Sequence, residues 1–506
     1  MKKIIFAVTI LILCYCNFVY ADTSSNIGDI NNDGLIDKND ASLLSNYLID
    51  NNITDDIKLL SDINSDNYVR INDLMLLLDF INIKDKINNI TDVSYLDEFE
   101  ITEADTNIVF ESSNDKIAVF ETDEDIIKLR FRRTGSVTIS MHINSLSFEK
   151  EITVSGNRIH FINLGQAGNA FLLESNGEFA LYDAGKSSDN ELINYIKDRY
   201  GINYLKFIII SHPHIDHNGE VVSILNSDIA VHGIYKKNYT NLDSDKVDDV
   251  DNASNSSIYA INKEILDIAN EKNVVIVNVD DFVNKYEGKS VITLGDMEFI
   301  LYNVRQRIVN DSTNHPEFDY DTSDYWAGKG ENINSIVALV RVNNHNVLLS
   351  GDLTHYSILT EILSRVNTLI EDETIDIYNI PHHANYNCTD EEELMVDATY
   401  YVASTYSDVL ASGNQYFRIS DNLVGNGAGE LVRGCFNYMG ISMFDAYYTA
   451  DAVYASGNKG AVVANLDDNL SIKYGKNRSC RYPNNGQIYD YDGAINANTN
   501  CSNLNG

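Results

Sequence analysis

The stretch IIISHPHIDHNGE, residues 208–220, brings three histidines and an aspartate into six consecutive positions, directly after a run of β-branched residues. Side chains alternate between the two faces of a strand, so His212, His214 and Asp216 should point to one side where the strand ends. His217 would then enter the following helix. Three imidazoles and one carboxylate suit Zn²⁺, or Fe or Mn, in sites that keep an open position for water. The pattern therefore predicts a metal site rather than a histidine-rich turn.

Further ligands are expected from the ends of two other apolar stretches. VLLSGDL ends one of them with Asp352, and IYNIPHHAN ends the other with His382 and His383. The carboxyl ends of neighbouring strands meet at one edge of a sheet, which is where binding sites of α/β proteins usually lie. The sequence alone leaves open which of the two adjacent histidines takes part.

The elements that must position these side chains are strands alternating with helices, from about residue 157 to residue 475. Strand patterns are seen in RIHFINLG, NAFLLES, EFALYDAG, KFIIISH, NSIVALVRV and TIDIYNIPHH, and helical patterns in NELINYIKDRYG and YSILTEILSRV. This alternation predicts an α/β domain with a parallel or mixed sheet.

The motif His212-x-His214-x-Asp216-His217, followed by Gly-Asp at a strand end and then by His-His, resembles the metallo-β-lactamase superfamily of hydrolases. INLGQAGNAFLLES, VLLSGDL and IPHHAN are most similar to the branch that includes the extracellular domain of the DNA-uptake competence protein and some phosphorylcholine esterases. The resemblance implies a four-layer αββα fold and one or two Zn²⁺ ions. It also implies that paired metals lower the pKa of a shared water, which would then attack an ester.

The resemblance also assigns roles to single residues. His212 and His214 would bind the first metal, and Asp216 and His217 the second, with Asp216 counted as catalytic as well. Asp352 would bridge the two ions, and one of the adjacent histidines, His382 or His383, would complete the second site. Many superfamily members have a further histidine where this chain has Asn334, a poorer ligand for Zn²⁺. A weak first site, and hence operation with one metal, is consistent with this difference.

Two twelve-residue stretches repeat 33 residues apart near the start of the chain: DINNDGLIDKND from Asp29 and DINSDNYVRIND from Asp62. Their spacing of oxygen ligands is typical of calcium loops. The predicted side-chain ligands are Asp29, Asn31, Asp33, Asp37 and Asp40 in the first loop, and Asp62, Asn64, Asp66 and Asp73 in the second. The second loop has Asn67 where glycine is usual and Arg70 at its ninth position, so we expect it to bind Ca²⁺ more weakly.

A duplicated loop of this kind, each copy followed by one helix, resembles the dockerin, an α-helical calcium-binding adaptor. The resemblance places a dockerin at residues 26–84 and implies two Ca²⁺ ions and a cohesin-bearing scaffold protein as partner, as in a cellulosome-like complex. Residues 88–155 change to a two-residue periodicity, in KIAVFET, IIKLRFRR and SVTISMHI, which predicts a small Ig-like β-sandwich spacer. Residues 476–506 form a polar tail to which we assign no function.

The first 21 residues have the charged, apolar and small-residue parts of a secretory signal, so we expect cleavage after Ala21 and an extracellular protein without membrane insertion. Cleavage removes two lysines and no acidic residue, and changes the formal net charge from −38 to −40. This acidity makes nucleic acid an unfavoured partner. Four cysteines remain, and their pairing is open between three disulfide arrangements and free thiols: Cys388, Cys435, Cys480 and Cys501.

Together these patterns predict a secreted, metal-dependent hydrolase of a phosphodiester or other small ester, attached to a scaffold. The alternative is a scaffold-borne binding module on a hydrolase fold that has lost turnover. Asn334 favours the alternative, whereas retention of the histidines and of Asp352 favours the enzyme.

Overall fold

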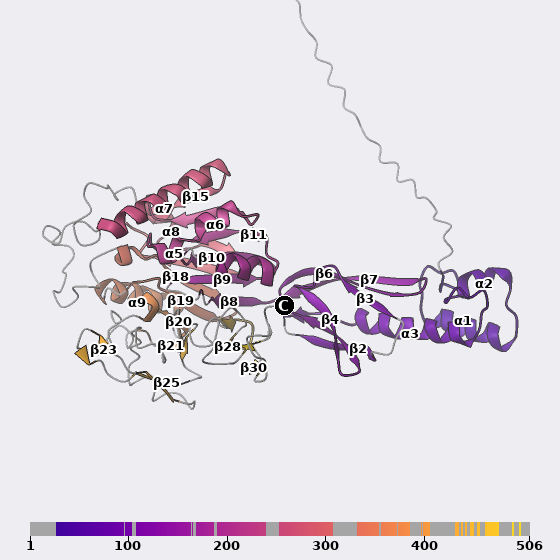
Figure 1. Cartoon of the computed structure of the whole chain (residues 1–506). Helices are drawn as coiled ribbons and strands as arrows, with labels where there is room; N and C mark the ends of the chain where they lie inside the picture. Colours follow the sequence, from indigo (N-terminus) through magenta and orange to yellow (C-terminus); the bar gives the residue numbers. More distant parts are fainter. Residues whose placement is uncertain are drawn as a thin grey trace, which may run out of the picture.

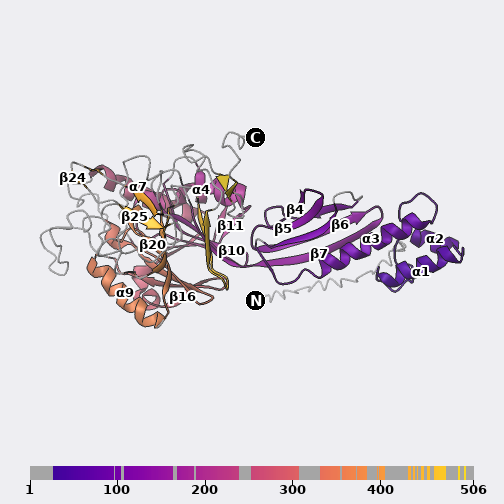
Figure 2. The same cartoon turned by 90° about the horizontal axis from the view of Figure 1, so that it is seen from below.

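We describe a computed structural model of the chain. It covers residues 27–238 apart from 96, 104–107, 163, 165–167 and 187–189, and residues 252–306. It also covers residues 331–404 apart from 354–355, 372, 385–395 and 397, residues 461–474, and short strands within 431–455 and 488–496. A large α/β part lies at one end, a group of strands lies in the middle, and three helices begin at the far end, the last of which, α3, extends along the middle strands (Figures 1 and 2).

The three helices are α1 (Lys38–Ile49), α2 (Asp55–Ser61) and α3 (Ile71–Asn88). Helices α1 and α3 follow the two predicted calcium loops, as the repeat indicated, whereas α2 lies between the repeats and was not predicted. Asp37 caps α1 in a capping box with Asp40, and this reciprocal bonding fixes where the helix begins. Buried apolar side chains such as Leu44, Leu77 and Phe80 pack α1 against α3.

The strands that follow form a four-stranded sheet in the order β1-β7-β6-β3 and a three-stranded sheet in the order β2-β5-β4. Their bounds are β1 Val93–Ser94, β2 Glu98–Glu103, β3 Val109–Ser112, β4 Ala118–Asp123, β5 Ile126–Phe131, β6 Gly135–Ile143 and β7 Leu146–Ser155. One buried apolar cluster contains Leu77 of α3 together with Phe131 and Ile139 of the two sheets. The helices and these strands therefore share a core.

The large part contains an eight-stranded sheet in the order β15-β14-β12-β10-β9-β8-β27-β28 and a seven-stranded sheet in the order β16-β17-β18-β19-β20-β21-β26. The first comprises β8 Asn157–Phe161, β9 Ala170–Ser175, β10 Glu178–Ala184, β12 Phe207–Ile209, β14 Gly233–Lys236, β15 Val275–Asn278, β27 Val462–Asn465 and β28 Ser471–Tyr474. The second comprises β16 Ser290–Leu294, β17 Met297–Tyr302, β18 Val337–Val342, β19 His345–Leu349, β20 Ile375–Ile380, β21 Ala398–Ala403 and β26 Val453–Ala455. Both sheets are mixed.

Helices cover the outer faces of these two sheets. They are α4 Glu191–Ile193, α5 Ile215–Asn218, α6 Val221–Asn226, α7 Asn252–Glu271 and α9 Tyr356–Ile370, whereas α8 Val283–Tyr286 contributes Tyr286 to the core between the sheets. One buried cluster, with Phe171 and Phe299, lies between the sheets. A second, with Leu172, Ile224 and Ile265, packs the first sheet against α6 and α7, and α9 covers the other sheet (Figure 2). This layering agrees with the predicted αββα architecture.

Smaller elements complete the description. They are the short strands β11 Tyr204–Leu205, β13 Ala230–Val231, β22 Leu431–Gly434, β23 Asn437–Tyr438, β24 Ile441–Ser442, β25 Ala446–Thr449, β29 Ile488–Tyr489 and β30 Ile495–Asn496. A π-helix, η1 Asn194–Arg199, and the 3-10 helices η2 Val279–Phe282, η4 Glu331–Asn334 and η5 His382–Ala384 are also present. No helix among the described residues is long and apolar enough to cross a membrane. The predicted leader and the four cysteines lie outside the described residues.

A buried polar network joins the middle strands to the large part. Only Gly156 separates β7 from β8, so the chain passes directly from one part to the other. The Glu174 carboxylate accepts hydrogen bonds from the Thr134 backbone N–H (2.8 Å) and hydroxyl (2.7 Å), which lie across the junction. Arg158 pairs with the same carboxylate at 2.6 Å, and its guanidinium lies 3.7 Å from the centre of the Tyr95 ring. Because these charged groups are fully buried, they constrain the junction strongly.

Candidate metal centre

The candidate site lies where strands of both sheets end at one edge of the domain. β10, β12 and β14 run parallel, and the segment after β12 carries His212 and leads into α5. β19 and β20 are parallel in the other sheet, and Asp352 and His383 follow their ends. Gly351 allows these segments to approach closely, because a Cβ there would lie 2.9 Å from Ser211 and its φ is +57°.

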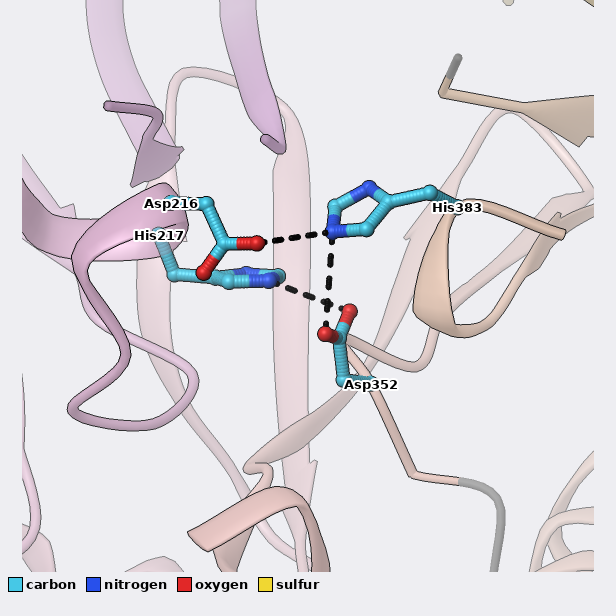
Figure 3. Close-up of side chains that lie close together, drawn as sticks. All are labelled: Asp216, His217, Asp352 and His383. Carbon is cyan, nitrogen blue, oxygen red and sulfur yellow. Dashed lines mark ion pairs between the residues drawn. The ribbon is translucent and has the colours of Figure 1, made fainter. Parts of the chain in front are cut away.

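Asp216, His217, Asp352 and His383 form a compact group that Figure 3 shows in close-up. His217 Nε2 lies 3.1 Å from Asp352 Oδ1. His383 Nε2 lies 3.4 Å from Asp216 Oδ2 and 3.6 Å from Asp352 Oδ2. Ligand atoms about 2.0–2.2 Å from one Zn²⁺ ion are themselves about 3–4 Å apart, so these separations fit a shared cation.

The ligand atoms of this group also fit a metal because they form ion pairs with one another but no hydrogen bond. His217 Nε2, His383 Nε2 and Asp352 Oδ1 are buried and make no hydrogen bond. Buried polar atoms in native proteins nearly always make a hydrogen bond, so three buried atoms without one that converge on a single point require an explanation. A divalent cation satisfies all three at once.

His212, His214 and Asp352 form a second group of potential ligands. His212 Nε2 lies 3.8 Å from Asp352 Oδ2 and 3.0 Å from His214 Nδ1. Asp352 therefore belongs to both groups, which is the arrangement expected of a bridging carboxylate. The assignment of the two metal positions to these residues remains the one that the resemblance implies.

The electrostatics of the site follow from burial and from the opposed charges. Burial alone would lower the pKa of His217, but the carboxylates of Asp352 and Asp183 raise it well above its usual range. Burial would raise the pKa of Asp352, but His217 and His383 hold it well below its usual range. Burial and its histidine neighbours lower the pKa of His212 well below its usual range.

Comparison with known proteins agrees with this geometry. The family model of the metallo-beta-lactamase superfamily matches residues 164–404, which include all of the site residues described above. Residues 164–404 form a metallo-beta-lactamase superfamily domain. Proteins of this superfamily are in general metal-dependent hydrolases that bind Zn²⁺, and the chain is an enzyme of that class.

No curated protein matches the chain. Among solved structures, the crystal structure of the metallo-beta-lactamase fold protein YhfI from Bacillus subtilis is similar at 12% sequence identity, with a TM-score of 0.29. The match covers 50% of this chain and 86% of that chain.

The structure shows which of the two adjacent histidines belongs to the site, a choice that the sequence left open. His383, and not His382, belongs to the four-residue group. The His383 Nδ1–H donates to the Ser404 carbonyl at 3.2 Å, which leaves Nε2 directed at the site. The backbone N–H of His382 donates to the Gly351 carbonyl, and its ring centre lies 6.2 Å from that of His383.

Asp183 is a residue of the candidate site that the sequence analysis missed. Its carboxylate accepts from His217 Nδ1 at 2.7 Å, from the Ser211 backbone N–H at 2.7 Å and from the Ser211 hydroxyl at 2.8 Å. This bonding fixes the tautomer of His217 and presents Nε2 to the site, as outer carboxylates do around metal-binding histidines. The aspartate in EFALYDAG at a strand end was the available signal.

These residues would hold one or two Zn²⁺ ions in the metallo-beta-lactamase domain. When bound, such ions lower the pKa of water and polarise the carbonyl or phosphoryl oxygen that is attacked. The chain itself orients the ligands through Asp183 and Ser404 and keeps His217, His212 and Asp352 buried.

Proposed function

We propose that this chain is an exported metal-dependent hydrolase of an ester bond, with phosphodiesters ahead of carboxylic esters, lactones and β-lactams. The observation that carries the proposal is the convergence of buried ligand atoms of His217, His383 and Asp352 that make no hydrogen bond. A phosphodiester carries a negative charge, and cations held by this group would offset the charge that develops during attack on phosphorus. Asp216, on the same helix as His217, completes the group.

A substrate panel tests this proposal. Chelator-treated and Zn²⁺-loaded protein would be assayed on bis(p-nitrophenyl) phosphate, a phosphorylcholine ester, a lactone and a β-lactam, beside the double variant His212→Ala, Asp216→Ala. We expect hydrolysis of the phosphodiester by the loaded protein, and its loss on chelation and in the variant. If wild type and variant do not differ on any substrate, the chain is instead a binding module on a degenerate hydrolase fold.

We further propose that residues 26–84 are a dockerin that attaches the enzyme to a cohesin-bearing scaffold outside the cell, with residues 88–155 as a β-sandwich spacer. The two loops contain equivalent hydrogen bonds, which supports the assignment of a dockerin. Asp29 accepts from the backbone N–H groups of Asp33 and Gly34, and Asp62 accepts from the equivalent groups of Asp66 and Asn67.

The last residue of each loop also plays the same part. Asp40 accepts from the backbone N–H groups of Asn31 and Asp37, and Asp73 from the equivalent groups of Asn64 and Arg70. The helical part also exposes apolar side chains that a protein partner could cover, among them Ile71 and Met75, which are 60% and 57% exposed.

The loops differ at their ninth position, and this difference predicts unequal calcium affinities. Asn67 adopts φ +67°, close to the +87° of Gly34, so its backbone does not prevent loop closure. Arg70, however, lies 3.5 Å from the Asp66 carboxylate, and its positive charge opposes a cation there. The first loop has Asp37 at the same position.

We therefore expect Arg70→Asp to tighten the weaker of two Ca²⁺ binding steps by about tenfold, or ~1.4 kcal/mol. Calorimetry with Ca²⁺ measures both steps, and Lys58→Asp, a change on α2 outside the loops, is the matched control. A single step that neither variant changes would contradict the two-loop assignment.

Calorimetry against cohesins, with and without chelator, tests the partner, and binding that does not depend on calcium would count against the dockerin.

A further inference from the structure

Two buried side chains, Lys237 and Asn334, meet beside the candidate metal centre. Both have no exposed surface, and Lys237 Nζ lies 3.3 Å from Asn334 Oδ1. An ammonium group has only donors, so the atom that faces it must be the amide oxygen. Lys237 also donates to the Arg305 carbonyl at 3.0 Å, so its ammonium is held from two sides.

Both residues are close in the chain to segments that contact His212 or the strand that leads to it. Lys237 directly follows β14, which is hydrogen-bonded to β12, the strand that leads to His212. Asn334 precedes Ser335, whose hydroxyl lies 3.3 Å from His212 Nδ1 and accepts from the Asp352 backbone N–H at 3.0 Å. The Lys237–Asn334 pair is therefore connected, through Ser335, to His212 and Asp352 of the second group.

The two groups of ligands differ in the number of residues and in the groups that orient their histidines. The four-residue group has three buried ligand atoms that make no hydrogen bond, and both of its histidines are oriented through Nδ1, His217 by a carboxylate and His383 by a carbonyl. The other group has three residues, and serine hydroxyls are the partners of His212 Nδ1. Asn334 is a poor fourth ligand, because Oδ1, the atom of an asparagine side chain that binds metal best, already accepts a hydrogen bond from Lys237.

We propose that the domain holds one cation tightly between Asp216, His217, Asp352 and His383, and that the Lys237–Asn334 pair keeps the position at His212 and His214 at low affinity. The pair acts in two ways: it withholds a fourth ligand, and it places a positive charge beside the second cation. A buried charge is poorly screened, so it opposes that cation more strongly than a surface lysine would. This inference rests on the metal-dependent hydrolase function proposed above.

Zn²⁺ alone is the probe that tests the inference. The full chain would be titrated with Zn²⁺ against a chelating competitor, and bound zinc measured by elemental analysis. We expect one tight equivalent in wild type, with a second at least 100-fold weaker. Asn334→His should strengthen the second step at least tenfold, because it supplies a ligand, and Lys237→Met should strengthen it because it removes the charge.

Lys236→Met is the matched control, since this neighbouring lysine is also buried and donates to the Lys237 carbonyl. Its second step should equal that of wild type. If Asn334→His does not fold, as thermal melting would show, Lys237→Met carries the test. Two equally tight equivalents in wild type would overturn the inference and leave the proposed function intact, whereas no bound zinc at all would contradict the proposed function itself.

Discussion

Replacing Asp352 with asparagine is expected to lower kcat/KM by about 10³-fold or more, equivalent to ~4 kcal/mol of transition-state stabilisation. Asp352 belongs to both groups of ligands, and its carboxylate lies within 3.1–3.8 Å of three imidazole nitrogens. Asparagine keeps the shape but removes the charge that binds a cation between these histidines. Bound zinc, measured by elemental analysis, should fall together with activity on the most rapidly hydrolysed substrate of the panel.

Substitutions at two further aspartates serve as comparisons for Asp352→Asn. Asp183→Asn should cost about 10–100-fold, because Asp183 orients His217 from behind rather than binding the metal. Asp376→Asn should have little effect on activity, since Asp376 lies on β20 and accepts from the Asn346 backbone N–H. An Asp352→Asn protein that retains both zinc and turnover would show that the chemistry lies elsewhere.

Local spacing was sufficient to predict part of this site. The segment from His212 to His217 was identified because its ligands are adjacent in sequence, and Asp352 because a polar residue ended an apolar strand. The choice between His382 and His383 depends on a turn in which both residues have positive φ, +52° and +56°. Strand alternation gives no guidance through such a turn, so the sequence left that choice open.

Contacts between distant segments could not be read from the sequence at all. Asp183 reaches His217 because β10 lies next to β12 and because the backbone at Asp183 is irregular, with φ +58° in a strand. Lys237 and Asn334 are 97 residues apart. The change of periodicity near Gly156 indicated where the chain passes into the α/β domain, but the pairing of Thr134 with Glu174 across it carries no local signature.

The junction gives the second large prediction: Glu174→Gln should lower the free energy of unfolding by about 3–5 kcal/mol. Glu174 is fully buried and pairs with Arg158, itself buried, so the variant leaves the guanidinium without its counter-charge. Urea denaturation followed by tryptophan fluorescence and circular dichroism measures the loss. Asp228→Asn, which breaks an exposed pair with Lys197, is the control and should leave the midpoint unchanged. Equal midpoints for both variants would contradict a structural role for the network.

The same network predicts how stability depends on pH. Burial lowers the pKa of His160, which lies 3.2 Å from Glu174, from 6.5 to about 4. Between these values the unfolded chain takes up a proton that the folded chain excludes, so stability falls as pH decreases from 6.5 toward 4. The shift corresponds to a loss of ~3 kcal/mol from this residue. His160→Gln should reduce this part of the pH dependence of stability. Glu174 contacts both sides of the junction, so the loss of stability at low pH should weaken the connection between them. The middle strands and the metallo-beta-lactamase domain should then unfold in two separate transitions.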